Sequence, residues 1–366
     1  MDRTIGDKLE DKVFDYAEAM VSTELYEGNR FAVGHPACHI FPLMLAVCGE
    51  DAIYTERFIT VFAAAYEIAA RWGASITFSN RILGHGTVMT AAAAVAYGLL
   101  TGVSEEELYE AVLIAGSLPC VSVWQSVFDG SRLHDCYSGL AGIIAIYSVK
   151  MAQRRVFSTE DMVAEVFGNI MGAVIRAEYL DKDLGKDFWI NRNYFKIHTG
   201  CRFIHPFADV ISRWMKEGLT EEDIDHIEIF TYKKAARLTA QTAVDDVEAK
   251  FSTPVSLAVM LHTGKLGHLS VRQYVTDETV RKLAKKISLH EDDAYNQLLP
   301  DVRGGRVVLF KNDGTCIREE VFHARGDFDD PDPFTVEDVI AKFRENAEGK
   351  MREEKQEEMI RSVLAS

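Results

Sequence analysis

Apolar residues recur every three or four positions through most of the first half of the chain, the spacing of one buried face of an α-helix. Two segments also carry a helix start signal: Ser104 is followed three residues later by Glu107, and Ser158 opens the sequence STED. Before residue 190 there is no Val- and Ile-rich alternation bounded by turns, so this half is expected to be helical. The predicted helices are residues 58–72, ended by Gly73, and residues 91–100, 105–114 and 162–175.

Period-two patterns appear only in the second half. Ile227, Ile229 and Thr231 alternate with Glu, Phe and Tyr, which predicts a strand over 227–232. Residues 306–310 and 316–322 flank the sequence Asn-Asp-Gly, whose Asp-Gly pair supplies the positive φ of a β-hairpin turn. Helical spacing returns between these strands at residues 207–216, 254–262 and 277–285. This half is therefore expected to mix α and β structure.

Changes of pattern indicate two domain boundaries. The polar stretch 181–193 separates the helical half from the mixed half, and Pro-Asp-Pro at 331–333 closes the latter. Residues 335–346 return to helical spacing, and the highly charged residues 348–358 predict a solvated terminal helix. The expected fold is mainly α: a discontinuous all-helical domain of residues 1–188, completed by 334–366, and a smaller α+β lid domain of residues 189–333.

The composition narrows the class of protein. The 366 residues are 48% hydrophobic and 26% charged, an ordinary globular balance that excludes a disordered or fibrous chain. The formal net charge of −16 argues against a nucleic-acid partner and against an anionic membrane, because both attract basic proteins. A small carboxylate substrate is compatible with this charge, since a local cluster of Arg, Lys and His opposes the global field. The apolar run 91–100 is shorter than the ~20 residues of a membrane-spanning helix.

The start of the sequence and its cysteines favour a cytoplasmic protein. Residues 1–12 are polar and acid-rich, without the apolar segment of a secretory signal. The 6 cysteines are widely spaced and form no CxxC pair, so reduced thiols are the simplest interpretation. We therefore expect the protein to be cytoplasmic.

Common nucleotide-binding, metal-binding and nucleophile motifs are absent from the sequence. It contains no GxGxxG after a strand, no P-loop, no HExxH and no GxSxG. His35 and His39 are four residues apart in HPACH and would share one face of a helix. A metal site would need a third ligand and a supporting shell, so a structural or catalytic use of His35 is favoured. We expect no metal and no organic cofactor.

Charged and imidazole side chains are concentrated in the segments that connect the apolar helices. A dicarboxylate or tricarboxylate site needs this combination, because Arg clamps carboxylates with two hydrogen bonds and His exchanges protons near neutral pH. Each residue alone has a plainer explanation, since a His beside Pro commonly caps a helix and a lone Arg commonly forms an ion pair. The set comprises Glu24, Glu27, Arg30, His35, His85, Arg132, His134, Lys196, Cys201, Arg202 and His205.

Six segments, in the right order, resemble the MmgE/PrpD family, which includes 2-methylcitrate dehydratase, cis-aconitate decarboxylase and iminodisuccinate epimerase. The segment ELYEGNRFAVGHPACHIFPLMLAV is similar to the family's entry loop, with its acidic cluster and HPG sequence. The others are AYEIAARWG, GHGTVMTAAAAVAYGLLTG, KIHTGCRFIHPFADVI, AKFSTPVSLAVMLHTGKLG, and RGGRVVLFKNDG followed by DPFTVEDVIAKF. The similarity spans residues 15 to 345 and starts inside the family's first helical region, so an N-terminal portion is expected to be absent.

The resemblance implies roles for individual residues. His35 matches the histidine of the family's HP pair, His205 matches its lid-domain histidine, and Glu24 matches the first acid of its acidic cluster. His134 stands where the family has an active-site lysine. The expected catalytic residues are His35, His205, Glu24, His134 and His85, and the expected substrate-binding residues are Arg30, Lys196, Arg202 and Arg132.

His35 and His205 are expected to share one site. Each precedes a proline, which disfavours the α conformation of the preceding residue and so helps to orient the imidazole. They come from different expected domains, so an interdomain cleft would bring them together, with His205 in proton transfer. Tyr26, Asn29 and Val255 depart from the family pattern.

The activity that the resemblance implies is cofactor-free proton chemistry next to a carboxylate. A His or Glu removes the α-proton, basic residues hold the carboxylates, and a second acid completes dehydration, decarboxylation or epimerisation. A dehydratase like 2-methylcitrate dehydratase is the leading hypothesis, with epimerase and decarboxylase as alternatives. A catalytically degenerate binding or scaffold subunit is a hypothesis of a different class. The resemblance also implies a homodimer formed through the helical domain, where residues 91–100 would pack closely.

Overall fold

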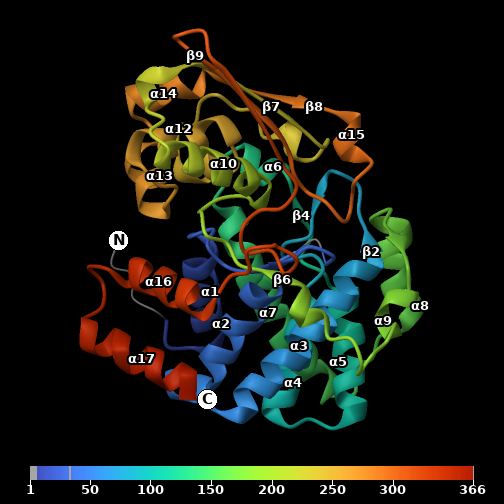
Figure 1. Cartoon of the computed structure of the whole chain (residues 1–366). Helices are drawn as coiled ribbons and strands as arrows, with labels where there is room; N and C mark the ends of the chain where they lie inside the picture. Colours follow the sequence, from blue (N-terminus) through green and yellow to red (C-terminus); the bar gives the residue numbers. More distant parts are fainter. Residues whose placement is uncertain (1–5, 33, 366) are drawn as a thin grey trace.

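The computed structural model describes residues 6–32 and 34–365, and its secondary structure is mainly helical, as expected (Figure 1). In the first half, α7 lies in contact with α1, α2, α4 and α5, and α2, α3 and α4 pack on one another. The helices of this half are α1 (Leu9–Val21), α2 (Pro36–Cys48), α3 (Glu56–Ser75), α4 (Thr90–Thr101), α5 (Glu105–Ser117), α6 (Gln125–Phe128), α7 (Leu133–Ala152), α8 (Glu160–Ala164) and α9 (Glu178–Asp181).

Local signals explain where several of these helices begin. Ser104 caps α5, with reciprocal hydrogen bonds to Glu107, so the predicted capping box is confirmed. The predicted start at Ser158 is wrong by one residue, because the side chain of Thr159 caps α8. The predicted helix over 162–175 is also wrong: α8 ends at Ala164, a π-helical turn follows over Glu165–Ile170, and the chain then becomes extended.

Gly73 does not end its helix, contrary to the prediction. α3 continues through it to Ser75, and a Cβ atom at Gly73 would lie 2.6 Å from the carbonyl oxygen of Ala32. The glycine therefore permits the loop before α2 to approach the helix closely, rather than breaking the helix.

Three short ladders in the first half correct the expectation of helix alone. They pair β1 (Gly28–Asn29) with β6 (Asn193–Tyr194), β2 (Ile76–Thr77) with β5 (Val174–Ile175), and β3 (Ile82–Leu83) with β4 (Ser122–Val123). The β1–β6 pair matters most for the site, because it places Gly28 opposite Tyr194. A side chain at Gly28 would collide with Tyr194 and His35, so only glycine allows these groups to meet.

The predicted hairpin and strand of the second half are confirmed. β7 (Ile224–Thr231) lies at the centre of a four-stranded sheet with the order β10–β9–β7–β8, where β8 is Ile287–Glu291, β9 is Gly305–Lys311 and β10 is Cys316–Val321. β7 is parallel to β8 and antiparallel to β9. The turn between β9 and β10 uses Gly314 at φ +86°, as its Asp-Gly sequence predicts.

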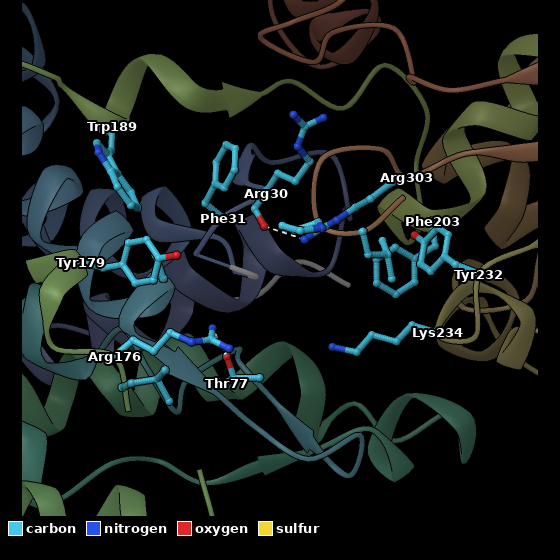
Figure 2. Close-up of a pocket in the computed structure, with 14 residues that line it drawn as sticks. Arg30, Phe31, Thr77, Arg176, Tyr179, Trp189, Phe203, Tyr232, Lys234 and Arg303 are labelled. Atoms are coloured by element: carbon cyan, nitrogen blue, oxygen red, sulfur yellow. Dashed lines mark hydrogen bonds between the residues drawn. The ribbon is translucent and has the colours of Figure 1, made fainter. Parts of the chain in front are cut away.

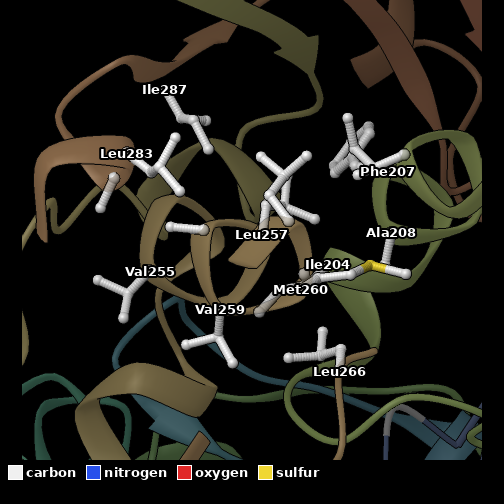
Figure 3. Packing of buried hydrophobic residues seen from close by; sticks show 14 of the residues in the cluster. Ile204, Phe207, Ala208, Val255, Leu257, Val259, Met260, Leu266, Leu283 and Ile287 are labelled. Atoms are coloured by element: carbon white, nitrogen blue, oxygen red, sulfur yellow. The ribbon is translucent and has the colours of Figure 1, made fainter. Parts of the chain in front are cut away.

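Helices cover one face of this sheet and form the second core. α12 (Thr253–Thr263) is buried along its length, and its Leu257 and Met260 lie among Phe207, Ile287 and their neighbours (Figure 3). Burial on all sides explains why α12 has no polar face. The other helices are α10 (His205–Lys216), α11 (Asp246–Lys250), α13 (His268–Tyr274), α14 (Glu278–Ala284) and α15 (Asp293–Asn296).

The C-terminal helices return to the first helices of the chain (Figure 1). Thr335 caps α16 (Val336–Ala347), and Lys342 donates a hydrogen bond of 2.7 Å to the carbonyl oxygen of Leu25. The charged terminal helix predicted over 348–358 begins later, as α17 (Glu353–Ala365). None of the helices in the described part of the chain is long and apolar enough to span a membrane.

Candidate active site

Loops from both halves of the chain enclose a small buried cavity, the candidate active site. The loop before α2, the start of α7 and the segment that follows β6 all contribute walls. The cavity volume is about 60 Å³, below the ~300 Å³ at the lower end of ligand pockets, so its walls are packed closely on one another. Of the nine expected site residues, those that line it are Glu24, His35, His85, His134, Lys196 and Arg202.

Glu24 and Lys196 form a buried ion pair in the wall of this cavity. The Lys196 Nζ atom lies 2.5 Å from Glu24 Oε2, and the two side chains are 3% exposed or less. Burial alone raises the pKa of Glu24, but Lys196 and His134 outweigh it and lower this pKa to about 2. Glu24 also adopts φ +51°, an uncommon conformation for a residue other than glycine. The pair is thus a fixed charged feature that joins segments 172 residues apart.

Tyr26 completes the environment of this pair. Its hydroxyl donates a hydrogen bond to Glu24 Oε1, and Lys196 Nζ lies 4.3 Å from the centre of its ring. Burial and the Glu24 carboxylate raise the pKa of Tyr26, so the phenol stays protonated and remains a donor. This departure from the family pattern therefore supports the ion pair.

His35 lines the cavity and has one ring nitrogen with a free lone pair. Its Nδ1 atom lies 2.7 Å from the carbonyl oxygen of Glu27, and a carbonyl only accepts, so Nδ1 carries the proton. Nε2 is then the basic nitrogen, and it has no hydrogen-bond partner in the described part of the chain. Burial, with a smaller effect of Lys196, lowers the pKa of His35 to about 3, so the ring is neutral.

His85 is a buried imidazole with neither nitrogen bonded among the described residues. It is 2% exposed and lines the cavity. Its ring stacks on His134 at 5.0 Å between centroids, and His134 Nε2 lies 3.6 Å from Glu24 Oε1. Burial and His39 hold the pKa of His85 well below its usual value. Buried polar groups nearly always have partners, so the unused N–H and lone pair of His85 fit a ligand in the cavity.

Cys38, His39 and His85 lie close enough to share a metal ion, but their hydrogen bonds do not fit one. His39 Nδ1 donates to the carbonyl oxygen of His35 at 2.8 Å, and His39 Nε2 accepts from the N–H of Gly86 at 2.8 Å. No lone pair of His39 is left for a ligand bond, and burial raises the pKa of the Cys38 thiol well above its usual value. His39 is therefore held by hydrogen bonds at both nitrogens and is not placed to bind a metal.

The charge of the cavity wall favours an anion. Among the described lining residues, Glu24 is the acid and Lys196, Arg202 and Arg303 are the cations. Arg202 forms an ion pair with Asp327 at 2.9 Å and donates to three main-chain carbonyls. Arg303 donates to the carbonyl oxygen of Arg30 and has no carboxylate partner in the described structure. Its guanidinium is thus available to a carboxylate ligand.

Three expected site residues do not line the cavity. Arg30 forms two hydrogen bonds with Asp329 and lies in the wall of a neighbouring cavity. Arg132 is half exposed and bridges Asp246 at 2.6 Å.

His205, the third of these residues, lies behind Arg202. Its Nδ1 atom accepts from Arg202 at 3.2 Å, and Nε2 lies 3.4 Å from the carbonyl oxygen of Gly200. It also has φ −58° and ψ −42°, which is α-helical, so the expected effect of Pro206 on its conformation is wrong. His35, by contrast, is outside the α region at φ −127° and ψ 80°, as predicted.

Sequence analysis did not single out two functional groups of this wall. Tyr194 lines the cavity, and its hydroxyl has no hydrogen-bond partner in the described structure. Burial raises the pKa of Tyr194, so it stays protonated and is a proton donor. Arg303 is the other. Tyr194 follows the predicted domain crossing and lies in none of the quoted segments. Arg303 opens the segment RGGRVVLFKNDG, whose resemblance to the family points to a hairpin and not to a site.

Two models of known protein families match the sequence of this chain. Residues 27–177 match the MmgE/PrpD N-terminal domain, and residues 198–366 match the MmgE/PrpD C-terminal domain. The chain therefore belongs to the MmgE/PrpD family. This family contains dehydratases and related enzymes, so membership supports an enzyme of the lyase type. Comparison with curated proteins finds no match.

Proposed function

We propose that the protein is a cofactor-free lyase that dehydrates a small di- or tricarboxylic acid by removing an α-proton, as 2-methylcitrate dehydratase does. The observation that carries the proposal is the state of His35: its Nδ1–H is bonded to Glu27, its Nε2 keeps a free lone pair, and the residue lines a cavity with three cations and one acid. A neutral, oriented imidazole beside cations is suited to proton abstraction next to a carboxylate.

Substrate binding in this proposal depends on the cations of the wall. Arg303 takes one carboxylate with its guanidinium, and Lys196 lies near enough to stabilise negative charge as the α-proton leaves. The His85 imidazole, which has no partner among the described residues, hydrogen-bonds a substrate oxygen.

The proton transfers then follow from the two free groups. His35 Nε2 takes the α-proton, the electron pair forms the new C=C bond, and the C–O bond of the β-hydroxyl breaks. Tyr194 gives its proton to the departing hydroxyl, which leaves as water, and His35 later returns its proton to Tyr194. Decarboxylation and epimerisation use the same first step and differ in where the second proton goes, so the products distinguish them.

The test begins with a thermal-shift screen of citrate-like, malate-like and aspartate-derived acids. Binding of a true ligand at a hundredfold excess over its Kd stabilises the protein by about 2.7 kcal/mol. Each ligand is then incubated with the wild type, His35→Gln and a control, His226→Gln, whose ring stacks on Phe310 away from the site. We expect loss of about 10²–10⁴ in kcat for His35→Gln alone. Stabilisation by an acid without turnover by the wild type would contradict the proposal and favour a degenerate binding subunit.

The proposal also includes the domain boundaries, the location in the cell and the oligomeric state of the protein. We assign residues 1–188 with 334–366 to a helical domain, residues 189–333 to a lid domain, and the functional unit to a cytoplasmic homodimer. The contact of Lys342 with Leu25 supports the return of the C-terminal helices to the first domain. Light scattering on the purified protein tests the dimer.

A further inference from the structure

A second cavity adjoins the candidate active site and has a different composition. The two cavities share Phe203 and Arg303 in their walls. The second is larger, at about 240 Å³. One of its walls comes from the segments 30–31, 74–77 and 176–189, and the other comes from residues 203, 232–234 and 299–303 (Figure 2). The proposed dehydration mechanism makes no use of this space.

Three cations of this second cavity have no carboxylate partner in the described structure. Arg176 donates to the hydroxyl of Thr77 at 3.2 Å, and Arg303 donates to the main-chain carbonyl of Arg30 at 2.6 Å. Lys234 is half-buried and has no hydrogen-bond or ion-pair partner among the described residues. By contrast, Arg30, the fourth cation of the wall, is neutralised by Asp329.

The cations approach from both sides of the cavity. Arg176 and Lys234 extend toward one another from opposite walls, and Arg303 lies on the same side as Lys234 (Figure 2). Burial, followed by the like charges of Arg303 and Arg237, lowers the pKa of Lys234. No described residue of the wall supplies a negative charge, although the chain as a whole has a net charge of −16. An anion that enters the cavity is therefore attracted by all three side chains.

The rest of the wall is apolar and largely aromatic. Trp189 and Tyr179 face the cavity from one side, Phe31 lies between, and Phe203 and Tyr232 form the other side (Figure 2). Aromatic rings in a wall prefer a flat apolar body to a hydrated inorganic ion, because they release water from apolar surface. The cavity therefore combines two requirements, a rigid apolar core in the ligand and negative charge at its ends.

We propose that this second cavity is a binding site for an aromatic or similarly compact apolar dicarboxylate, with Lys234 and Arg303 holding one carboxylate and Arg176 holding the other. It adjoins the proposed catalytic cavity and shares Arg303 with it, so a carboxylate held by Arg303 in one cavity competes with one in the other, but its ligand binding is measured without the proposed reaction. Arg303 contributes to both walls, so occupancy of one cavity is coupled to the position of this side chain in the other.

The experiment uses isophthalate as the probe, with benzyl alcohol and inorganic phosphate as partial mimics of its apolar and anionic character. Trp189 lines the second cavity and Trp124 lines the candidate active site, so indole fluorescence reports the two cavities separately. We expect isophthalate to change the fluorescence of the wild type and of Trp124→Phe, and to leave Trp189→Phe unchanged. Circular dichroism and calorimetry on each variant confirm that it is folded and measure its affinity independently.

Charge variants test the recognition itself. We expect Lys234→Gln combined with Arg176→Gln to weaken isophthalate by about tenfold or more, since two charge-assisted hydrogen bonds are lost. Lys233→Gln, the exposed neighbour of Lys234, is the matched control and keeps the affinity. Benzyl alcohol and phosphate are expected to bind at least about tenfold more weakly than isophthalate. Equal affinity in the double variant, or a fluorescence response that disappears only in Trp124→Phe, would overturn the proposal and leave the proposed catalytic function untouched.

Discussion

The imidazole of His35 is bonded to the main chain of Glu27, and the side chain of Glu27 is bonded to the helix that His35 begins. His35 Nδ1 lies 2.7 Å from the Glu27 carbonyl oxygen, while Glu27 Oε1 accepts from the N–H of Ala37 at 2.5 Å. Tyr66 holds the second carboxylate oxygen at 2.7 Å. A single acidic residue thus fixes both the ring of His35 and the start of α2, so the proposed base is oriented from two directions.

Replacing Glu27 by Gln is expected to change how stability depends on pH. Burial is the largest influence on the Glu27 carboxyl and raises its pKa to about 7, from an ordinary 4.5. Between pH 4.5 and 7 the folded protein holds a proton on Glu27 that the unfolded chain releases. The contribution of this protonated carboxyl to the free energy of unfolding is therefore fully present below about pH 4.5 and is lost as the pH rises through 7. In urea titrations at a series of pH values, the free energy of unfolding of the wild type should fall relative to that of Glu27→Gln as the pH rises through this range. Parallel curves for the two proteins would contradict the assignment.

His35 is expected to have the opposite effect on the pH dependence of stability. Burial lowers its pKa to about 3, from an ordinary 6.5, so the unfolded chain takes up a proton before the folded protein does. The stability that His35 contributes is therefore present above about pH 6.5 and is lost as the pH falls toward 3. His35→Gln should lose less stability than the wild type on acidification in this window. The matched control is His226→Gln, which removes a partly exposed histidine of β7 outside the cavity, and its curve should differ from that of His35→Gln.

The Glu24–Lys196 pair should behave as one unit in a double-mutant cycle. Removing one partner leaves the other as an unpaired buried charge, so Glu24→Gln and Lys196→Met should each cost about 3–5 kcal/mol of unfolding free energy. The double variant should cost clearly less than the two single changes together. Lys150→Met, which breaks the exposed pair with Glu10, should cost less than about 1 kcal/mol and serves as the control. Additive losses in the cycle would show that the two charges do not interact.

Sequence patterns predicted the features that depend on neighbouring residues. The Ser104 cap and the hairpin turn at Gly314 follow from residues within a few positions of each other, and the structure confirms both. The contact of Glu24 with Lys196 joins residues 172 positions apart, and no local pattern specifies such a pairing. Tyr26 departs from the family pattern, and the departure alone does not indicate that its hydroxyl donates a hydrogen bond to Glu24. The sequence indicates which charged residues could gather at a site, but Arg30 and Arg132 lie outside the cavity and Arg303, which lines it, carries no local signal of that position.

His205 is where sequence and geometry differ most, and one substitution decides its role. The sequence predicts proton transfer at a site shared with His35, but both His205 nitrogens lie against protein atoms and the ring is 1% exposed. We therefore expect a positioning role, in which His205 accepts a hydrogen bond from Arg202 and so helps to orient that guanidinium in the cavity wall.

His205→Gln should keep kcat within about tenfold of the wild type, because no proton transfer of the kind worth ~10²–10⁴ is lost. It should raise KM for the acid found in the screen and lower the thermal midpoint, since a buried hydrogen bond is disturbed. His205→Asn, whose amide oxygen takes the place of Nδ1 and can still accept from Arg202, should show the smaller KM of the two. The measurements are kcat and KM for both variants, with circular dichroism as the fold control. A folded His205→Gln that loses a hundredfold or more in kcat at unchanged KM would restore the catalytic assignment and remove the positioning one.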